Sequence, residues 1–420
     1  MSLFLRNFPS LIVKTHKIKS FPSVRKFLSQ AYFCSEHWEH RLKDPILQKV
    51  NVEDFYQDLE LRHSKTGKIS AIDVDIFANA VKEDTYIEEL LDLVHKLRLS
   101  ADTQNTLNST SHAVIRYLNN TNNDEVLLRV LDDRLNYGIF LDYHIANLLM
   151  FDYYKKGLFA NGARVAANLM LQEEFESPLS INLGLLNCYN YLKDPKGWPE
   201  LEKIEEPEEE VKIRVKYLRN PFDDDHFDLT APNKIIGKTL ITFTKNPESV
   251  LEKSLHLLGL ILYEKLDKSK DFSNKLDKIH SDILKLIPDD NEIKKLIVEI
   301  PQDSEDVQTL LEQRVKDSER KMGERDISNQ CDLYNKWIEE RKKSLLEQNE
   351  RIRSEQRLLD VETLKKDLQE RETKLWFFEN EEKIELEILA KSQMQKQNES
   401  VEEKKVSEKK EDLKKNKGLK

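Results

Sequence analysis

The chain has 420 residues, and its 67 basic against 77 acidic side chains give a formal net charge of −10. It contains only 10 Gly and 12 Pro, roughly half the average usage or less, which leaves little material for many-stranded sheets or Gly-rich phosphate loops. The composition therefore predicts a mostly α-helical fold. Three distant cysteines, Cys34, Cys188 and Cys331, exclude a disulfide framework and a zinc cluster. The longest apolar run, residues 257–263, is far shorter than the ~18 residues that a membrane span needs.

The first 30 residues have the composition of a mitochondrial transit peptide. Six basic residues and several serines, but no acidic residue, precede Glu36. A basic segment without carboxylates is typical of the signals that direct proteins into mitochondria. We therefore predict a transit peptide over residues 1–30, with its processing region near residues 25–28. The alternative is a basic N-terminal arm that stays on the mature protein.

Residues 31–195 show an apolar pattern of paired helices that repeats about every 35 residues. In the clearest copy, Asp142 is a good cap for the first helix and Gly157 a good terminator. The second helix then carries small residues, including Ala163 and Ala166, that let two helices approach closely. Because such a hairpin cannot bury its own apolar face, we expect three or four hairpins to stack into an α-solenoid.

Residues 196–245 are predicted to be an acidic linker followed by a basic extended segment. Seven carboxylates lie between residues 200 and 210. Apolar and basic residues then alternate over residues 211–219, and a strict period of two predicts an extended backbone with one apolar and one basic face.

Residues 246–302 are predicted to form a helical hairpin module. Asn246 and Pro247 are typical of a helix start, and Leu251 opens the apolar face of the helix that follows. Apolar residues between Phe272 and residue 283 have the spacing of a partner helix, which should stop at Pro288.

Residues 303–395 are predicted to form a long charged helix with some coiled-coil character. Ile338, Leu345, Ile352 and Leu359 recur at intervals of seven residues, but the companion positions are mostly polar. Because only one of the two heptad positions is apolar, we expect this helix to dock on the surface of a partner and not to form a dimer by itself. The apolar residues 375–378 are a candidate anchor for that contact. The Lys-rich residues 396–420 have almost nothing to bury, so we expect a disordered tail.

Catalytic chemistry has no positive support in this sequence. Gly237, Lys238 and Thr239 resemble the end of a phosphate-binding loop, but Pro232 stands where that loop requires glycine. The acidic residues 223–228 lack the glycine turn and the ligand spacing of a calcium loop, so a hydrated loop is the better interpretation. We therefore expect no enzymatic activity, no cofactor, no metal site and no small-molecule substrate.

Nucleic-acid binding remains a candidate function. Helical-repeat arrays can read single-stranded RNA through a few side chains of each repeat. Asn147 lies where such an array places a base-reading residue, although a solvated side chain without a role is an equal alternative. The basic segment and the Lys-rich tail supply cations that can hold phosphates. The candidate RNA-binding residues are Asn147, Lys212, Arg214, Lys216, Arg219, Lys404, Lys405, Lys409 and Lys410.

Two resemblances to known families arise from these residues. Residues 135–150 resemble the pentatricopeptide-repeat pattern, with Leu141 in place of the usual proline. The whole chain is similar to the family of mitochondrial small-subunit ribosomal proteins numbered twenty-seven. The specific matches lie at residues 28–39, 137–150 and 170–176, and a long C-terminal helix containing Trp337 matches in character.

The second resemblance implies a non-catalytic component of the small subunit of the mitochondrial ribosome. Such a protein would lie in the matrix, contact small-subunit rRNA and other small-subunit ribosomal proteins, and support mitochondrial translation. The upstream repeats lack a clear counterpart of Asn147, so base-by-base reading is not expected. Two alternatives stay open: a free pentatricopeptide-repeat factor for a mitochondrial transcript, and a helical scaffold that contacts only proteins.

Overall fold

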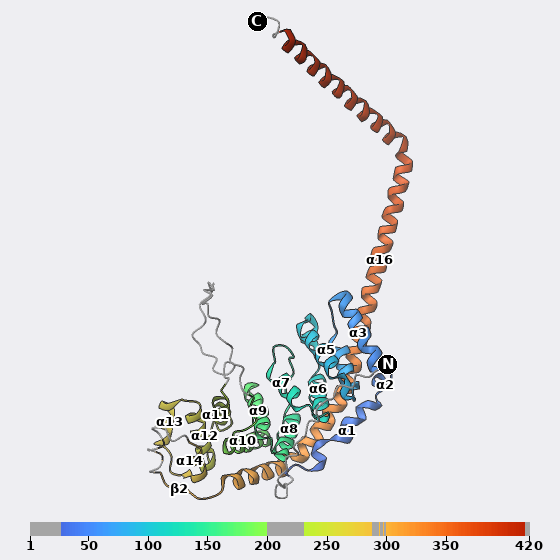
Figure 1. Cartoon of the computed structure of the whole chain (residues 1–420). Coiled ribbons are helices and arrows are strands. Elements are labelled where there is room, and N and C mark those ends of the chain that lie inside the picture. The colour runs from blue at the N-terminus through green and yellow to red at the C-terminus, as the bar shows by residue number, and fades with distance from the viewer. Residues whose placement is uncertain (1–26, 200–230, 288–293, 295–296, 298–299, 416–420) are drawn as a thin grey trace, which may run out of the picture. The chain divides into compact units, whose positions relative to one another are not determined.

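The computed structural model describes residues 27–199, 231–287, 294, 297 and 300–415, with side chains as far as residue 397. The chain divides into two compact units, Met1–Lys342 and Lys343–Lys420. The described part of the first unit contains a stack of helices, and that of the second unit is the remainder of one long helix (Figure 1).

The described helices of the first unit begin with a short N-terminal group and continue as helical pairs. The N-terminal group consists of η1 (Gln30–Phe33), α1 (Ser35–His40), η2 (Arg41–Lys43), α2 (Pro45–Gln48) and α3 (Val52–Thr66). The pairs comprise α4 (Ala71–Ala80), η3 (Asp84–Tyr86), α5 (Ile87–Leu99), η4 (Ala101–Asn105), α6 (Asn108–Asn120), α7 (Asp124–Asp132), α8 (Tyr143–Lys156), α9 (Phe159–Leu171) and α10 (Pro178–Lys193).

The first helices of these pairs, α4, α6, α8 and α10, recur at about 35 residues and pack in order (Figure 1). The ends of α8 are those that the sequence predicts. Asp142 Oδ1 accepts a hydrogen bond of 2.7 Å from the Ile145 amide, and Gly157 closes the helix with a φ of 74°. One continuous apolar core runs through the stack. The predicted mostly α fold with a helical solenoid is thereby confirmed.

The second helical module differs from its predicted boundaries. It starts with α11 (Pro232–Phe243), which packs along α12 (Val250–Leu262), so half of the hairpin lies in the segment predicted to be linker and extended chain. The two helices approach so closely that a Cβ added to Gly237 would lie 2.9 Å from the carbonyl oxygen of Gly259. Gly237 therefore serves helix packing, which explains the glycine in the motif that resembles a phosphate loop.

The predicted partner helix of this module is replaced by shorter elements. These are α13 (Leu266–Ser273), β1 (Ile279–His280) and α14 (Ser281–Leu286), and β1 pairs in parallel with β2 (Gln302–Asp303). Apolar spacing identifies which side chains are buried, and Ile279 and Ile283 are indeed buried. It does not require that one continuous helix buries them.

The last described element is α16 (Val307–Lys415), a helix of 109 residues. Its first part, up to Lys342, belongs to the first unit, where Val307, Leu311 and Val315 are buried in the core. The helix also continues through residues 396–415, where we expected a disordered tail. Glu, Lys and Gln are good helix formers, so a segment with little to bury can still be helical.

The predicted transit peptide overlaps the folded body at its end. Residues 1–26 lie outside the described part, but Phe27 and Leu28 are buried in the core. The Lys316 ammonium of α16 lies 5.7 Å from the centre of the Phe27 ring. The folded body therefore includes Phe27, four residues before its predicted start at residue 31.

Candidate functional site

A row of polar residues follows the first helices of the repeats. The fifth residue of α4 is Asp75, of α6 His112, of α8 Asn147 and of α10 Asn182. Equivalent positions of stacked, equivalent helices point to the same side of a solenoid. We call these four residues the polar row. Three members match Asn147 in the other described repeats, although the sequence had indicated no clear counterpart.

Each member of the polar row is hydrogen-bonded to a segment of the same chain. Asn147 Nδ2 donates to the Tyr32 hydroxyl at 2.9 Å, and Asn182 Nδ2 donates to Ser318 Oγ at 2.8 Å. Ser318 belongs to α16, and the other two members also bond to this helix, His112 to Tyr334 at 3.1 Å and Asp75 to Arg341 at 2.7 Å. The N-terminal segment and the first part of α16 thus contact all four side chains of the polar row.

Asn147 is therefore not an accessible base-reading residue in this structure. Its side chain is fully buried, between α8 and the N-terminal segment that carries Tyr32. That segment is held by two further contacts: His144 Nε2 donates to the Tyr32 carbonyl at 2.8 Å, and the Arg116 guanidinium donates to the carbonyl of Phe33. The alternative of a solvated side chain therefore does not describe Asn147.

The first position of the polar row is a buried ion pair. Asp75 Oδ2 accepts from Arg341 Nε at 2.7 Å, and the exposed fractions of the two side chains are 0% and 2%. Asp75 Oδ1 also accepts from the hydroxyls of Ser109 and Thr110, the latter at 2.9 Å, and from Asn79 Nδ2 at 3.1 Å. With these donors the carboxylate is well satisfied, which a buried charge requires.

The second position is a buried histidine within an aromatic group. His112 Nδ1 donates to Asp142 Oδ2 at 2.6 Å, so that its other ring nitrogen accepts from the Tyr334 hydroxyl. The rings of Trp38, Tyr334 and Trp337 lie 5.0, 5.4 and 5.2 Å from the His112 ring. Helices α1, α6 and α16 therefore meet at this side chain.

Burial decides the protonation of the histidines near the polar row. It lowers the pKa of His112 below its ordinary value, although the Asp142 carboxylate acts in the opposite direction. Burial likewise lowers the pKa of His144, to about 4. Both rings are neutral near pH 7, which is consistent with the hydrogen bonds that each makes. Both imidazole rings form hydrogen bonds to other segments of the chain, and neither is a base at a surface cleft.

The side chains of the remaining predicted RNA-binding residues lie outside the described part of the structure. Lys212, Arg214, Lys216 and Arg219 lie outside the described residues. Lys404, Lys405, Lys409 and Lys410 lie in α16, where only the backbone is described. Among the described residues, no group of three His, Cys, Asp or Glu side chains is arranged to bind a metal ion. In the same part of the chain, no helix combines the length and the apolar character needed to cross a bilayer.

Sequence reasoning missed three members of the polar row and their partners. Asp75, His112 and Asn182 share the fifth position with Asn147, so the repeat period itself carried the signal. Arg341 occupies one of the polar companion positions of the heptad pattern, and it is buried against Asp75.

One comparison with known proteins matches most of the chain. A family model described as mitochondrial 28S ribosomal protein S27 matches residues 4–367. The matched range includes the N-terminal segment, the helical pairs, the second helical module and the part of α16 that covers the polar row.

Proposed function

Because the chain belongs to the family of mitochondrial 28S ribosomal protein S27, a family of the mitochondrial small ribosomal subunit in the matrix, we propose that it is a non-catalytic structural component of that subunit. In this role it contacts small-subunit rRNA and neighbouring ribosomal proteins and supports mitochondrial translation. The chain's own segments cover the polar row, and this observation supports a structural role over a free reader of single-stranded RNA.

The first experiment is a gradient fractionation of mitochondria that produce a tagged full-length chain. Under ionic conditions that preserve ribosomes, the chain should sediment with the small subunit and with assembled ribosomes. A chain that stays with the soluble matrix proteins at the top of the gradient would contradict the proposal. The free-reader alternative predicts instead tight, sequence-selective binding of single-stranded RNA by the purified chain, with selectivity lost in Asn147→Ala.

The second experiment tests the rRNA contact. Replacing Lys212, Arg214, Lys216 and Arg219 together by Ala should reduce incorporation, so that the chain leaves the particle at a lower salt concentration. The salt dependence of binding should also become less steep, because fewer counterions are released when fewer phosphates are contacted. A control with the same charge change replaces the exposed residues Lys268, Lys270, Lys275 and Lys278. Equal incorporation of both variants would reject the basic segment as the rRNA contact. Crosslinking that recovers no RNA on either the segment or the lysine tail would favour the protein-only scaffold.

A further inference from the structure

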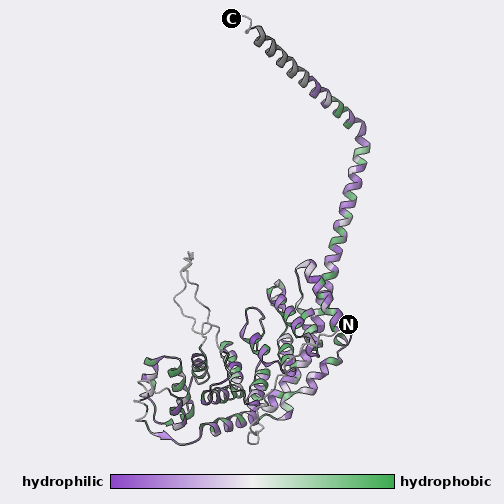
Figure 2. Ribbon diagram, viewed as in Figure 1, coloured by the Kyte–Doolittle hydropathy of each residue, from purple (hydrophilic) through white to green (hydrophobic). Residues whose placement is uncertain are grey.

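The second unit of the chain presents a row of exposed apolar side chains along α16. In the described residues 361–389, six of the nine heptad positions a and d are apolar: Val361, Leu364, Leu368, Leu375, Phe378 and Leu389. The other three positions are Arg371, Glu382 and Glu385. We call the six apolar residues the apolar seam. Their exposed fractions run from 48% for Val361 to 67% for Phe378. Figure 2 shows hydrophobic residues in green among the hydrophilic residues of α16. An isolated helix gains no stability from such an exposed apolar row, whereas a packed helical partner would bury it.

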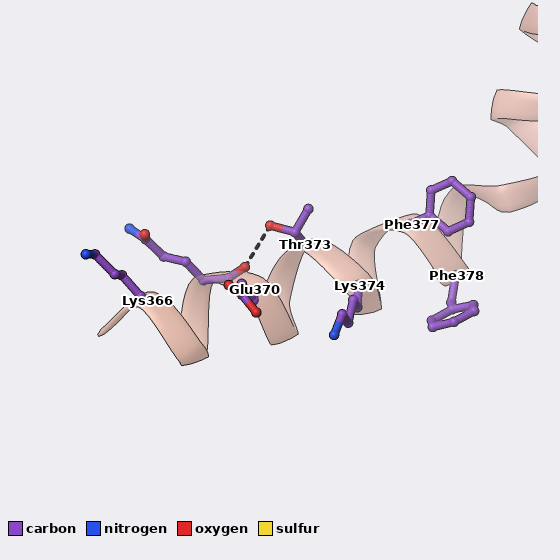
Figure 3. A pocket seen from close by; sticks show the side chains of 7 residues that line it. Lys366, Glu370, Thr373, Lys374, Phe377 and Phe378 are labelled. Carbon is purple, nitrogen blue, oxygen red and sulfur yellow. Dashed lines mark hydrogen bonds between the residues drawn. The ribbon is translucent and has the colours of Figure 1, made fainter. Parts of the chain in front are cut away.

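The apolar seam lies on a different side of α16 from the earlier heptad residues. Leu359 ends the series of apolar residues at intervals of seven, and Val361 begins the seam two residues later, which is roughly half a turn around the helix. Lys366 and Glu370 occupy heptad positions f and c, on the side of the helix away from the seam, and both are drawn in Figure 3. A shallow groove of about 600 Å³ follows that polar side and ends at Phe377 and Phe378.

Charges within and beside the seam define what can pack on it. Arg371 occupies a d position between Leu368 and Leu375, so a partner helix needs an acidic side chain opposite it. The flanking e and g positions carry five acids and two bases, so the flanks of the partner need to be mainly basic. These flanking residues are Asp360, Lys365, Asp367, Glu372, Lys374, Glu379 and Glu381.

The same charges disfavour a second copy of this chain and a nucleic acid. A parallel pair of copies in register would place Arg371, Glu382 and Glu385 each against the same residue of the other copy within the seam, where like charges repel. An antiparallel pair brings the e positions of both copies together, where Glu372 and Glu379 are both acidic. RNA would place its phosphates beside the same acidic flanks.

We propose that the apolar seam docks an amphipathic helix of another protein of the ribosomal particle. That helix has apolar residues at heptad spacing, an acidic residue opposite Arg371 and predominantly basic flanks. The proposal rests on the proposed function, because the particle supplies the partner.

A site-specific crosslink in the intact particle tests this surface. The photoreactive amino acid benzoylphenylalanine replaces Leu368 or Leu375 in the tagged full-length chain, and Glu370 in the control. Particles are collected from the gradient, irradiated and digested, and crosslinked peptides are identified by mass spectrometry. Both seam positions should crosslink to one segment of another protein, with apolar heptads and net positive flanks, at a yield at least five-fold above the control.

Any other result of the crosslinking experiment would overturn the docking proposal. These outcomes are crosslinks to rRNA, to a second copy of the chain or to a segment with acidic flanks, and yields equal to the control. They differ from failure of the proposed function, because in that case the chain would not sediment with the particle at all.

Charge reversal gives a second readout on the same particles. Arg371→Glu should lower the crosslink from Leu375 at least five-fold, because it opposes the acidic residue of the partner. Lys366→Glu makes the same charge change on the polar side and should leave the crosslink unchanged. A basic residue introduced in the partner at the position facing residue 371 should restore crosslinking to Arg371→Glu. The proposed contact of Arg371 with the partner would be rejected if Arg371→Glu and Lys366→Glu changed the crosslink yield equally. It would also be rejected if the basic residue in the partner did not restore the crosslink.

Discussion

At the scale of single residues, the chain depends on polar side chains that are buried against one another. Asp75 and Arg341 show this most clearly, because both are almost completely removed from solvent. A buried pair adds little net stability when intact, since desolvation opposes the attraction between the charges. Loss of one partner is costly, because the other charge is then left in the protein interior.

Arg341→Met should therefore lower the free energy of unfolding by about 3–5 kcal/mol. Adding Asp75→Asn should recover part of this loss, since no uncompensated charge then remains. Denaturant unfolding of the purified chain measures both, with the exposed Lys343→Met as the control. A double variant no more stable than Arg341→Met alone would show that charge is not the cause.

The neutral histidines predict a loss of stability in acid. In the folded chain, burial lowers the pKa of His144 from the ordinary histidine value of 6.5 to about 4. The nearby His112 and Arg116 also lower this pKa, whereas the Asp142 carboxylate raises it. The unfolded chain therefore takes up a proton first as the pH falls. This contribution to stability is complete above about pH 6.5 and is lost as the pH falls towards 4.

His144→Gln should flatten this part of the pH profile. Glutamine keeps an N–H donor for the Tyr32 carbonyl but does not titrate, so the slope should fall by about 1.4 kcal/mol per pH unit within the window. Denaturant unfolding at intervals between pH 7 and 4 measures the slope, and His37→Gln, at an exposed site, is the control. An unchanged slope in His144→Gln would show that the ring is protonated in the folded chain.

At the scale of elements, helix packing depends on small residues at crossing points. A Cβ on Gly237 would lie 2.8 Å from the backbone nitrogen of Tyr263 and 2.9 Å from the carbonyl oxygen of Gly259. Backbone atoms cannot move aside as a flexible side chain can. The α11 and α12 pair therefore tolerates no larger residue at this crossing without separating.

Gly237→Ala should consequently destabilise the chain by about 1–3 kcal/mol. The control is Gly323→Ala in α16, where the new Cβ would lie 3.5 Å from the side chain of Glu319. There the substitution should stabilise by about 0.5–1 kcal/mol, because alanine is the better helix former. Thermal unfolding monitored by circular dichroism compares the two variants. The same sign of change in both would contradict the packing role of Gly237.

Local signals in the sequence predicted some elements well. Asp142 and Gly157 mark the ends of α8 because capping is decided by neighbouring residues alone. Helix α11 was missed because it lies in the segment predicted to be linker and extended chain, and only contact with α12 explains the glycine at position 237. The burial of Asn147 and Arg341 was missed for a related reason. Their partners lie more than 100 residues away, beyond the reach of any local pattern.

At the scale of the whole molecule, α16 joins repeats that are distant in sequence. Ser318 contacts α10, Tyr334 contacts α6 and Arg341 contacts α4, so one helix bonds to three described repeats. Repeat proteins commonly depend on contacts between neighbours alone. Here a single element spans the stack, and we expect the repeats of the first unit to unfold together.

Truncation tests this coupling. A chain that ends at residue 342 keeps the covered polar row and should unfold at the same denaturant midpoint as the full chain. A chain that ends at residue 306 loses the contacts to α16 and should unfold at a lower midpoint in a broader transition. Far-ultraviolet circular dichroism measures both transitions. Equal midpoints would mean that the repeats are stable without α16.

The pairing of Asp75 with Arg341 also sets an order of events during synthesis. The two residues are 266 positions apart, and a chain is made from its N-terminus. The first repeat therefore leaves the ribosome that makes it long before the guanidinium that neutralises its carboxylate exists. Until Arg341 has been made, burying the Asp75 carboxylate in this repeat costs desolvation free energy that no ion pair offsets. The earliest part of the solenoid to be made is in this sense the last to be completed.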